Sequence, residues 1–142
     1  MNDNPNDSPP KPNPKLDLNK PKLTPADKQI LKAESAVIKA KYPQHIPVIV
    51  RTDPKSDLTL SKHKFLVNNE VTVGQLMYIV RKKLTSDLHS SHALFMFVNN
   101  KLPPTSALIS SIYAIDKDPD TDMLHIVLCK ENTFGSLKTN NP

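Results

Sequence analysis

The sequence contains few of the residues on which cofactor and nucleic-acid chemistry usually depends. Two glycines in 142 residues leave no glycine-rich loop to hold a phosphate. The single cysteine, Cys129, excludes an internal disulfide and a cysteine-based metal site, and it fits a reducing compartment such as the cytosol. Tryptophan is absent, and the three tyrosines and four phenylalanines form no stripe with basic residues, which argues against a nucleic-acid groove.

Long apolar runs are missing as well. The first thirty residues contain no apolar stretch of the kind found in signal peptides, and later apolar runs have only strand length, well below the about 20 residues that cross a bilayer. Nineteen basic and fourteen acidic residues give a net charge of +5, a balance that is common in soluble proteins. We therefore expect no membrane-spanning segment, and the charge alone identifies no partner.

Proline is concentrated at the start of the chain. Residues 1–24 hold six of the fourteen prolines among Asn, Asp, Ser and Lys, a composition that cannot offset the entropy lost on ordering. This predicts a disordered arm over residues 1–24. Its run Pro9-Pro10-Lys11-Pro12 could dock an aromatic groove as a polyproline helix, although a solvated spacer is the commoner use of such a run.

A first helix is predicted from residue 25 to about residue 41. Thr24 followed by Pro25 is typical of a helix start, and Pro43 ends the pattern. Four apolar residues recur at helical spacing and are expected to face the core: Ile30, Ala33, Val37 and Ala40. A neighbouring face is apolar and acidic, and it carries Leu31, Glu34 and Ile38.

Four runs predict strands, at residues 46–50, 64–67, 93–98 and 123–129. Pro47 cannot donate a backbone hydrogen bond, which places that part of the first strand near a sheet edge. The run 93–98 is continuously apolar, so both of its faces should be buried. Asn99 and Asn100 tolerate positive φ angles and predict a tight hairpin turn after it.

Two further helices are predicted between these strands. Thr72 and Gln75 form a capping box, and apolar residues then recur every three or four positions through Leu84. Thr105 is expected to cap a short helix that ends near Tyr113. The resulting order, a strand hairpin followed by a helix that crosses a mixed sheet, is the α+β arrangement called the β-grasp, found in ubiquitin-like proteins. We expect this domain to span residues 25–130, with the first helix as an N-terminal extension.

Residues 131–142 are predicted to form a flexible polar tail that contains one of the two glycines, Gly135. A glycine lacks a Cβ atom, so it can pass through a narrow enzyme cleft. Ser136 to Pro142 follow it, which is the pattern of a precursor trimmed after Gly135. A frayed tail with an incidental glycine is the alternative that the tail alone leaves open.

Several runs, in order and in register over about residues 28–135, resemble the autophagy ubiquitin-like modifiers, the GABARAP and light-chain-3 type proteins and their yeast counterpart. The runs are Ile46-Pro47-Val48-Ile49-Val50, Lys64 to Val67, Leu66 to Lys83, Phe97-Val98-Asn99-Asn100, Leu102 to Ala107, Ser110-Ser111-Ile112-Tyr113 and Glu131-Asn132-Thr133-Phe134-Gly135.

The resemblance implies a covalent modifier. A dedicated cysteine protease would cut after Gly135, with Phe134 part of the recognised segment. An activating enzyme and then a conjugating enzyme would carry the glycine as a thioester to the amine of phosphatidylethanolamine. The protein would need no other cofactor, and it would be cytoplasmic until the lipid attached it to autophagosome or vesicle membranes, in autophagosome formation.

The resemblance also implies a groove for receptor and cargo peptides with an aromatic residue and, three positions later, an aliphatic one, which would add a strand beside residues 64–67. The first pocket would be lined by Glu34, Ile38, Pro47, Ile49, Lys64, Leu66 and Met123. The second would be lined by Phe65, Val67, Val71, Leu76 and Ile79. Ordinary core packing is the alternative for these residues.

Four positions depart from the family pattern, namely Met123 and Leu76, where phenylalanine is common, His45, where arginine is common, and Asn68, where proline is common. Met is adaptable and narrower than an aromatic ring, so it predicts a looser floor for the first pocket.

Three other interpretations have less support from the residues. One is a β-grasp adaptor that binds short peptides and is never conjugated. Another is a thiol enzyme that uses Cys129 and His125, but both lie on one predicted strand without an acid to orient the base. His89 and His92 have a spacing that two metal ligands could use, but they have no obvious third ligand. We expect neither enzyme activity nor a metal site.

Overall fold

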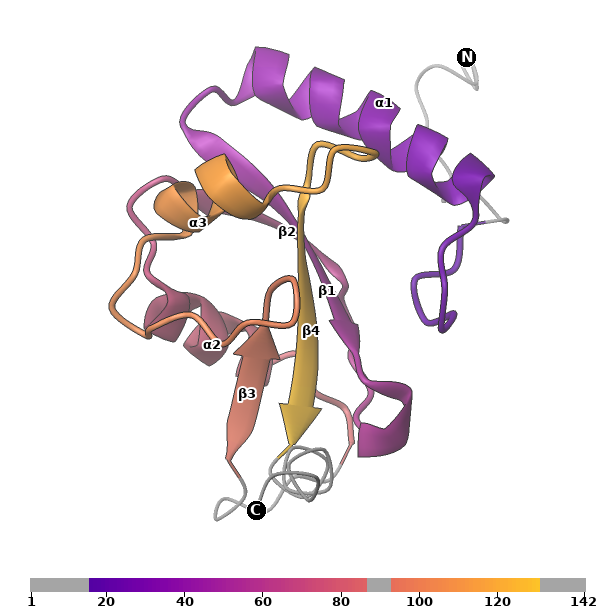
Figure 1. Ribbon diagram of the computed structural model, residues 1–142, viewed down its shortest axis with the longest axis vertical. Coiled ribbons are helices and arrows are strands. Elements are labelled where there is room, and N and C mark those ends of the chain that lie inside the picture. The colour runs from indigo at the N-terminus through magenta and orange to yellow at the C-terminus, as the bar shows by residue number, and fades with distance from the viewer. Residues whose placement is uncertain (1–15, 87–92, 131–142) are drawn as a thin grey trace, which may run out of the picture.

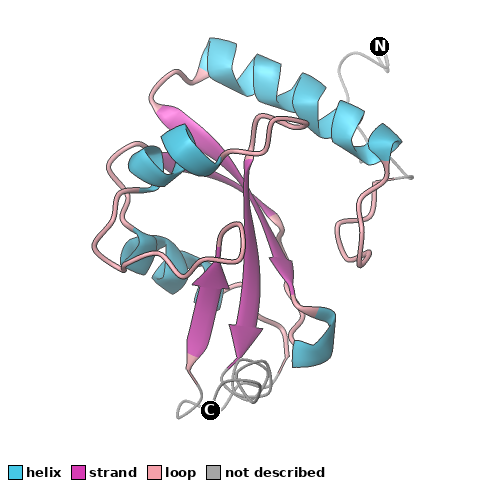
Figure 2. Cartoon of the chain, viewed as in Figure 1, coloured by secondary structure: helices cyan, strands magenta, loops and turns pink. Residues whose placement is uncertain are grey.

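The computed structural model describes residues 16–86 and 93–130, which form a mixed sheet with helices on both of its faces (Figures 1 and 2). The elements are α1 (Pro25–Lys41), β1 (His45–Thr52), a short 3-10 helix (Pro54–Ser56), β2 (Lys64–Asn68), α2 (Val73–Arg81), β3 (Leu94–Phe97), α3 (Ile109–Asp116) and β4 (Leu124–Lys130).

The four strands lie in the order β2-β1-β4-β3. β1 and β2 form an antiparallel hairpin in which Ile49 is opposite Lys64. β1 and β4 are parallel, and β3 is antiparallel to β4. This is the predicted α+β arrangement of the β-grasp. β1 lies inside the sheet, but its pairing with β4 begins only at Val48, one residue after Pro47.

Each face of the sheet has its own apolar core. Alternate β1 residues, including Val48 and Val50, point into a large core shared with α2 and α3. Ile49 points the other way, into a smaller core under α1. In Figure 1, α2 and α3 lie on one side of β4, α1 crosses the top of the sheet, and residues 16–24 lie on the other side. The N-terminal helix is therefore an outer layer, as predicted.

The predicted core face of α1 is wrong. Val37 has 55 % of its surface exposed, whereas Leu31 is fully buried. The buried face carries Asp27, Leu31 and Ser35, because both polar residues find partners there. The Ser35 hydroxyl donates to the carbonyl oxygen of Asp122 at 3.1 Å, and Asp27 completes the capping box with Thr24. Two of the four residues of the predicted stripe, Ala33 and Ala40, are alanines, which favour helices without needing burial.

The predicted disorder of residues 1–24 is wrong for residues 16–24. Leu18 and Leu23 are buried in the smaller core, and this burial offsets the entropy lost on ordering the segment. Residues 1–15 and 131–142, and the loop with His89 and His92, lie outside the described residues.

Local signals located α2 and the hairpin turn correctly, but not α3. Thr72 and Gln75 form the predicted capping box, and Asn99 and Asn100 have φ angles of 49° and 63°. α3 begins at Ile109 rather than after Thr105, and it runs to Asp116. Thr105 instead uses its carbonyl oxygen to accept a hydrogen bond from the Gly74 amide at 2.9 Å.

Within residues 16–86 and 93–130, no helix has the length and apolar character needed to cross a membrane. In the same residues, no group of three or more His, Cys, Asp or Glu side chains is placed to hold a metal ion.

Candidate functional site

A cavity of about 160 Å³ lies between α1 and the β1–β2 hairpin. Its wall contains all seven residues predicted for the first pocket, so the fold brings together side chains from four separate elements or loops. The lining residues are Glu34, Ile38, Pro47, Val48, Ile49, Lys62, Lys64, Phe65, Leu66 and Met123.

The rim of this cavity is basic and partly exposed. Lys64 Nζ lies 2.9 Å from Glu34 Oε1 and 2.9 Å from Oε2, and this ion pair joins β2 to α1. The Lys62 ammonium lies 5.1 Å from the centre of the Phe65 ring. Two lysines against one glutamate leave an excess of positive charge, which suits an acidic ligand.

The floor of the cavity is apolar and buried. Ile49 and Met123 expose 1 % and 2 % of their surfaces, whereas Leu66 on the rim exposes 41 %. Lys64, Leu66 and Asn68 are the outward residues of β2, and Phe65 and Val67 are its buried ones. β2 ends the sheet order within the described residues, so a peptide strand can add beside it and place a side chain in the cavity.

The residues predicted for the second pocket lie mostly in the large core. Phe65 and Val67 expose 5 % each, Leu76 is fully buried, and Val71 packs against them. Only Ile79, at 38 %, reaches the surface substantially. The burial of the first three agrees with ordinary core packing, and their role in peptide binding stays a prediction.

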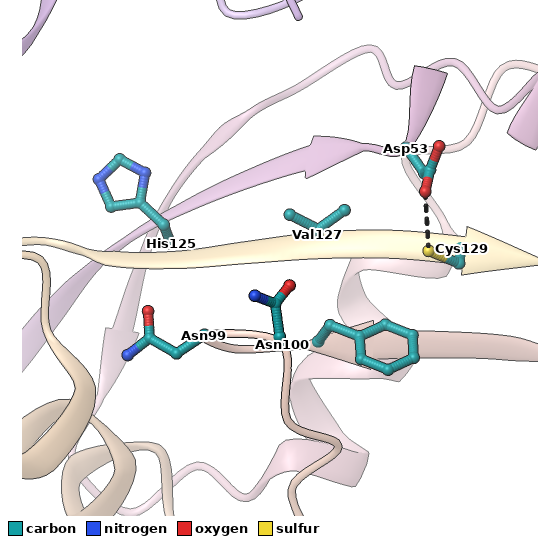
Figure 3. Close-up of a pocket in the computed structure, with 7 residues that line it drawn as sticks. Asp53, Asn99, Asn100, His125, Val127 and Cys129 are labelled. Carbon is teal, nitrogen blue, oxygen red and sulfur yellow. Dashed lines mark hydrogen bonds between the residues drawn. The ribbon is translucent and has the colours of Figure 1, made fainter. Parts of the chain in front are cut away.

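A larger cavity, of about 510 Å³, lies on the outer face of β4 (Figure 3). Sequence patterns did not reveal it, although the alternation in β4 correctly predicted two faces. Its lining residues are Asp53, Phe97, Asn99, Asn100, His125, Val127 and Cys129. Because Phe97 is half-buried and lines this cavity, the expected burial of both faces of residues 93–98 is wrong.

The structure does not place Cys129 and His125 as a nucleophile and base. In Figure 3 they lie at opposite ends of the cavity with Val127 between them. Burial and the neighbouring Asp53 carboxylate raise the pKa of the Cys129 thiol to about 12, and Sγ donates to Asp53 Oδ2 at 3.6 Å. His125 Nε2 instead lies 2.8 Å from the Thr121 hydroxyl, and burial lowers the pKa of the imidazole. A protonated thiol without a base nearby is not an activated nucleophile.

The four positions that depart from the family pattern have different environments. Met123 forms part of the floor of the smaller cavity, and Leu76 lies in the large core. His45 and Asn68 are opposite each other where β1 begins and β2 ends. Of these four positions, only Met123 lines the smaller cavity.

Phe134 and Gly135 lie outside the described residues. β4 ends at Lys130, at the end of the domain opposite α1 (Figure 1). Gly135 follows five residues later, which is a span of at most about 18 Å in extended backbone.

Comparison with known proteins identifies the family. Residues 31–135 match the model of the family described as "Autophagy protein Atg8 ubiquitin like", and the match ends at Gly135. The chain belongs to the Atg8 family. Autophagy-related protein 8a of Arabidopsis thaliana is 48 % identical over 106 residues, covering 74 % of this chain and 84 % of the relative. Autophagy-related protein 8 of Neurospora crassa is 47 % identical over 109 residues, covering 76 % and 88 %.

Solved structures of the Atg8 family share the fold. The crystal structure of Trypanosoma brucei ATG8 has a TM-score of 0.66 and 30 % identity, covering 73 % of this chain and 88 % of that one. Plasmodium falciparum Atg8, in complex with a peptide of Plasmodium falciparum Atg3, has a TM-score of 0.61 and 30 % identity, covering 71 % and 88 %. These matches confirm the predicted ubiquitin-like fold.

In this Atg8 family member, the sequence predictions for the smaller cavity omitted Val48 and Lys62 and assigned Phe65 to the second pocket alone. Lys62 could have been predicted, because side chains two residues apart in a strand share one face, and residue 62 lies two positions before Lys64. Val48 had none, since its alternation with Ile49 assigns it to the opposite face of β1.

Proposed function

We propose that this Atg8-family autophagy protein is a modifier that is cut after Gly135 and joined through the new carboxylate to phosphatidylethanolamine. The observation that carries the proposal is that the family match begins within α1, covers the rest of the folded domain and continues through Gly135. In this proposal a cysteine protease hydrolyses the bond between Gly135 and Ser136. The activating enzyme then converts the new carboxylate to an acyl-adenylate with ATP, releasing pyrophosphate, and an enzyme thiol displaces AMP to form a thioester. After transfer to the thiol of the conjugating enzyme, the lipid amine displaces that thiol to form an amide.

The physical case for a lipid rests on anchoring strength. A net charge of +5 over the whole chain cannot hold a domain on a membrane stably, whereas a lipid with two acyl chains can. The protein would be cytoplasmic before conjugation and bound to autophagosome membranes afterwards.

It would act as a substrate of its processing and conjugating enzymes and would catalyse nothing itself. A conjugating enzyme as partner is supported by the Plasmodium relative, which was solved with a peptide of Atg3.

The cavity beside β2 supports a second role, the recruitment of receptors. A peptide strand beside β2 would place its aromatic residue above Ile49 and Met123 and its acidic neighbours near Lys62 and Lys64. The aliphatic residue would reach the region of Val67 and Ile79. Each buried anchor contributes about 1.5 to 3 kcal/mol, and ordering the peptide offsets much of this, so we expect dissociation constants in the micromolar range.

The test compares Gly135→Ala with Thr139→Ala, a change in the segment that would be removed. Wild type and Thr139→Ala should give a lipid-conjugated form in the membrane fraction, and Gly135→Ala should give none. If Gly135→Ala still reaches membrane puncta and binds receptor peptides as wild type does, the protein is the unconjugated adaptor instead.

A further inference from the structure

Residues 16–24 are attached to the outer face of the sheet by several independent contacts. Arg51 on β1 donates from Nε to the carbonyl oxygen of Leu18 at 3.3 Å, and from its terminal nitrogen to the carbonyl oxygen of Lys20. The Lys20 ammonium lies 2.6 Å from Oδ2 of the buried Asp27 on α1. A single guanidinium that binds two carbonyl oxygens two residues apart holds this stretch of backbone against β1.

The same segment supplies part of the core beneath the peptide cavity. Leu18 and Leu23 form one buried apolar cluster with Leu31, Ile49 and Met123, against which Leu16 and Ile38 pack. Three members of this group, Ile38, Ile49 and Met123, also line the cavity between α1 and β2. Ile38, Ile49 and Met123 therefore line the cavity and also belong to the apolar cluster that contains the two leucines of the N-terminal segment.

We propose that Leu18 and Leu23 are positioning residues that set the depth of the peptide cavity, and hence the size of the aromatic side chain that it accepts. This inference rests on the proposed peptide-binding function and deepens it. None of residues 16–24 lines the cavity. It acts through Met123 and Ile49, whose packing against the leucines fixes where the cavity floor lies.

Met123 makes this coupling strong. Methionine is unbranched and has three rotatable side-chain bonds, so its position depends on the atoms that surround it. An empty space left behind it would be filled by movement of the most adaptable neighbour. Truncation of Leu18 therefore lets the Met123 side chain retreat, and the cavity deepens toward the N-terminal segment.

A deeper cavity changes selectivity and not only affinity. A phenylalanine side chain would lose contact with the withdrawn floor, while the larger indole of tryptophan would still reach it. We expect Leu18→Ala to weaken binding of a phenylalanine peptide by about fivefold and that of the matching tryptophan peptide by less than about twofold, because loss of close contacts forfeits much of the packing energy.

The experiment measures both dissociation constants by calorimetry with the full chain. The two synthetic peptides are acid-flanked, have Phe or Trp as the anchor and Leu three residues later, and are otherwise identical. The matched control is Leu94→Ala, because Leu94 exposes 8 % of its surface as Leu18 does but lies in the other core. Leu18→Met serves as the conservative rescue, and Leu18→Val replaces Leu18→Ala if the latter does not fold.

We expect the preference for tryptophan over phenylalanine to rise in Leu18→Ala and to stay unchanged in Leu94→Ala. Leu18→Met should keep the wild-type preference. The NMR signal of the Met123 methyl group should move in Leu18→Ala only. An unchanged preference in Leu18→Ala, or an equal change in Leu94→Ala, overturns the inference while the proposed function stands. A wild-type chain that binds neither peptide overturns the proposed receptor function and this inference with it.

Discussion

Lys64 on β2 forms an ion pair with Glu34 on α1 at the cavity between these elements, with its ammonium 2.9 Å from each carboxylate oxygen. The two side chains expose 45 % and 36 % of their surfaces, so water screens the pair and it contributes at most about 1 kcal/mol to folding. The pair therefore links two elements of the site without being needed for the fold. An acidic peptide can compete with Glu34 for the same ammonium.

Replacement of Lys64 by Gln should weaken the binding of an acid-flanked peptide by about two- to fivefold, the range expected for an exposed charge pair. The salt dependence of binding should fall at the same time, because one charge contact is lost. Calorimetry at low and high salt measures both effects. Lys32→Gln is the control, since Lys32 is exposed on α1 and donates to the Pro119 carbonyl, away from the cavity. Equal losses in the two variants would exclude a specific role for Lys64.

Leu66→Ala tests the exposed rim of the cavity. Leu66 exposes 41 % of its surface, so its truncation should change the free energy of unfolding by no more than about 0.5 kcal/mol. Loss of an interface leucine should weaken peptide binding by about 1 to 2 kcal/mol, or roughly five- to thirtyfold. The matched control is Leu102→Ala, because Leu102 exposes 49 % and does not line the cavity. Unchanged affinity in Leu66→Ala would mean that peptides do not use this cavity.

The stability of the protein should fall in acid as Asp27 takes up a proton. The Lys20 ammonium and the Thr24 amide donate to its carboxylate and lower the pKa of Asp27 from 3.8 to about 2. The unfolded chain binds this proton at higher pH than the folded chain, so the stabilisation is complete above about pH 4 and is lost as the pH falls toward 2. Urea unfolding across this interval measures the loss.

Asp27→Asn should flatten that pH dependence, and Lys20→Met should reduce it only in part, because the Thr24 hydrogen bond remains. A wild-type chain whose urea midpoint falls no more steeply between pH 4 and 2 than that of Asp27→Asn would contradict the assignment.

Cys129 should resist alkylation while the protein is folded. The thiol is buried, and its pKa is raised to about 12, so little thiolate forms near neutral pH. We expect iodoacetamide at pH 8 to react at least about a hundredfold more slowly with the folded chain than with the urea-unfolded chain, because only the thiolate is nucleophilic. Mass spectrometry follows the reaction, and Cys129→Ser gives the background. Similar rates in the two states would show that the thiol is accessible and ionised.

Local signals explain which elements could be predicted. The Thr72 and Gln75 capping box and the Asn99-Asn100 turn each depend on residues a few positions apart, and both occur as predicted. The prediction of the buried face of α1 was wrong because the periodicity counts an alanine as apolar whether it is buried or exposed. It also could not foresee that Ser35 would find the Asp122 carbonyl, 87 residues away.

The candidate site depends on contacts that no local pattern specifies. Glu34 and Lys64 are 30 residues apart, and Met123 comes from the far end of the domain. The resemblance to the family assigned these residues to one pocket, because members of a family share the tertiary contacts of their fold. The burial of Leu18 and Leu23 in the smaller core was not predicted, because prolines and polar residues surround these two leucines in the sequence and indicate disorder.

The intact mass of the protein recovered from starved cells decides most directly whether Gly135 is an attachment residue. We predict a species that has lost Ser136 to Pro142 and gained the mass of phosphatidylethanolamine less one water. A population that is entirely full-length and unmodified under starvation would contradict conjugation.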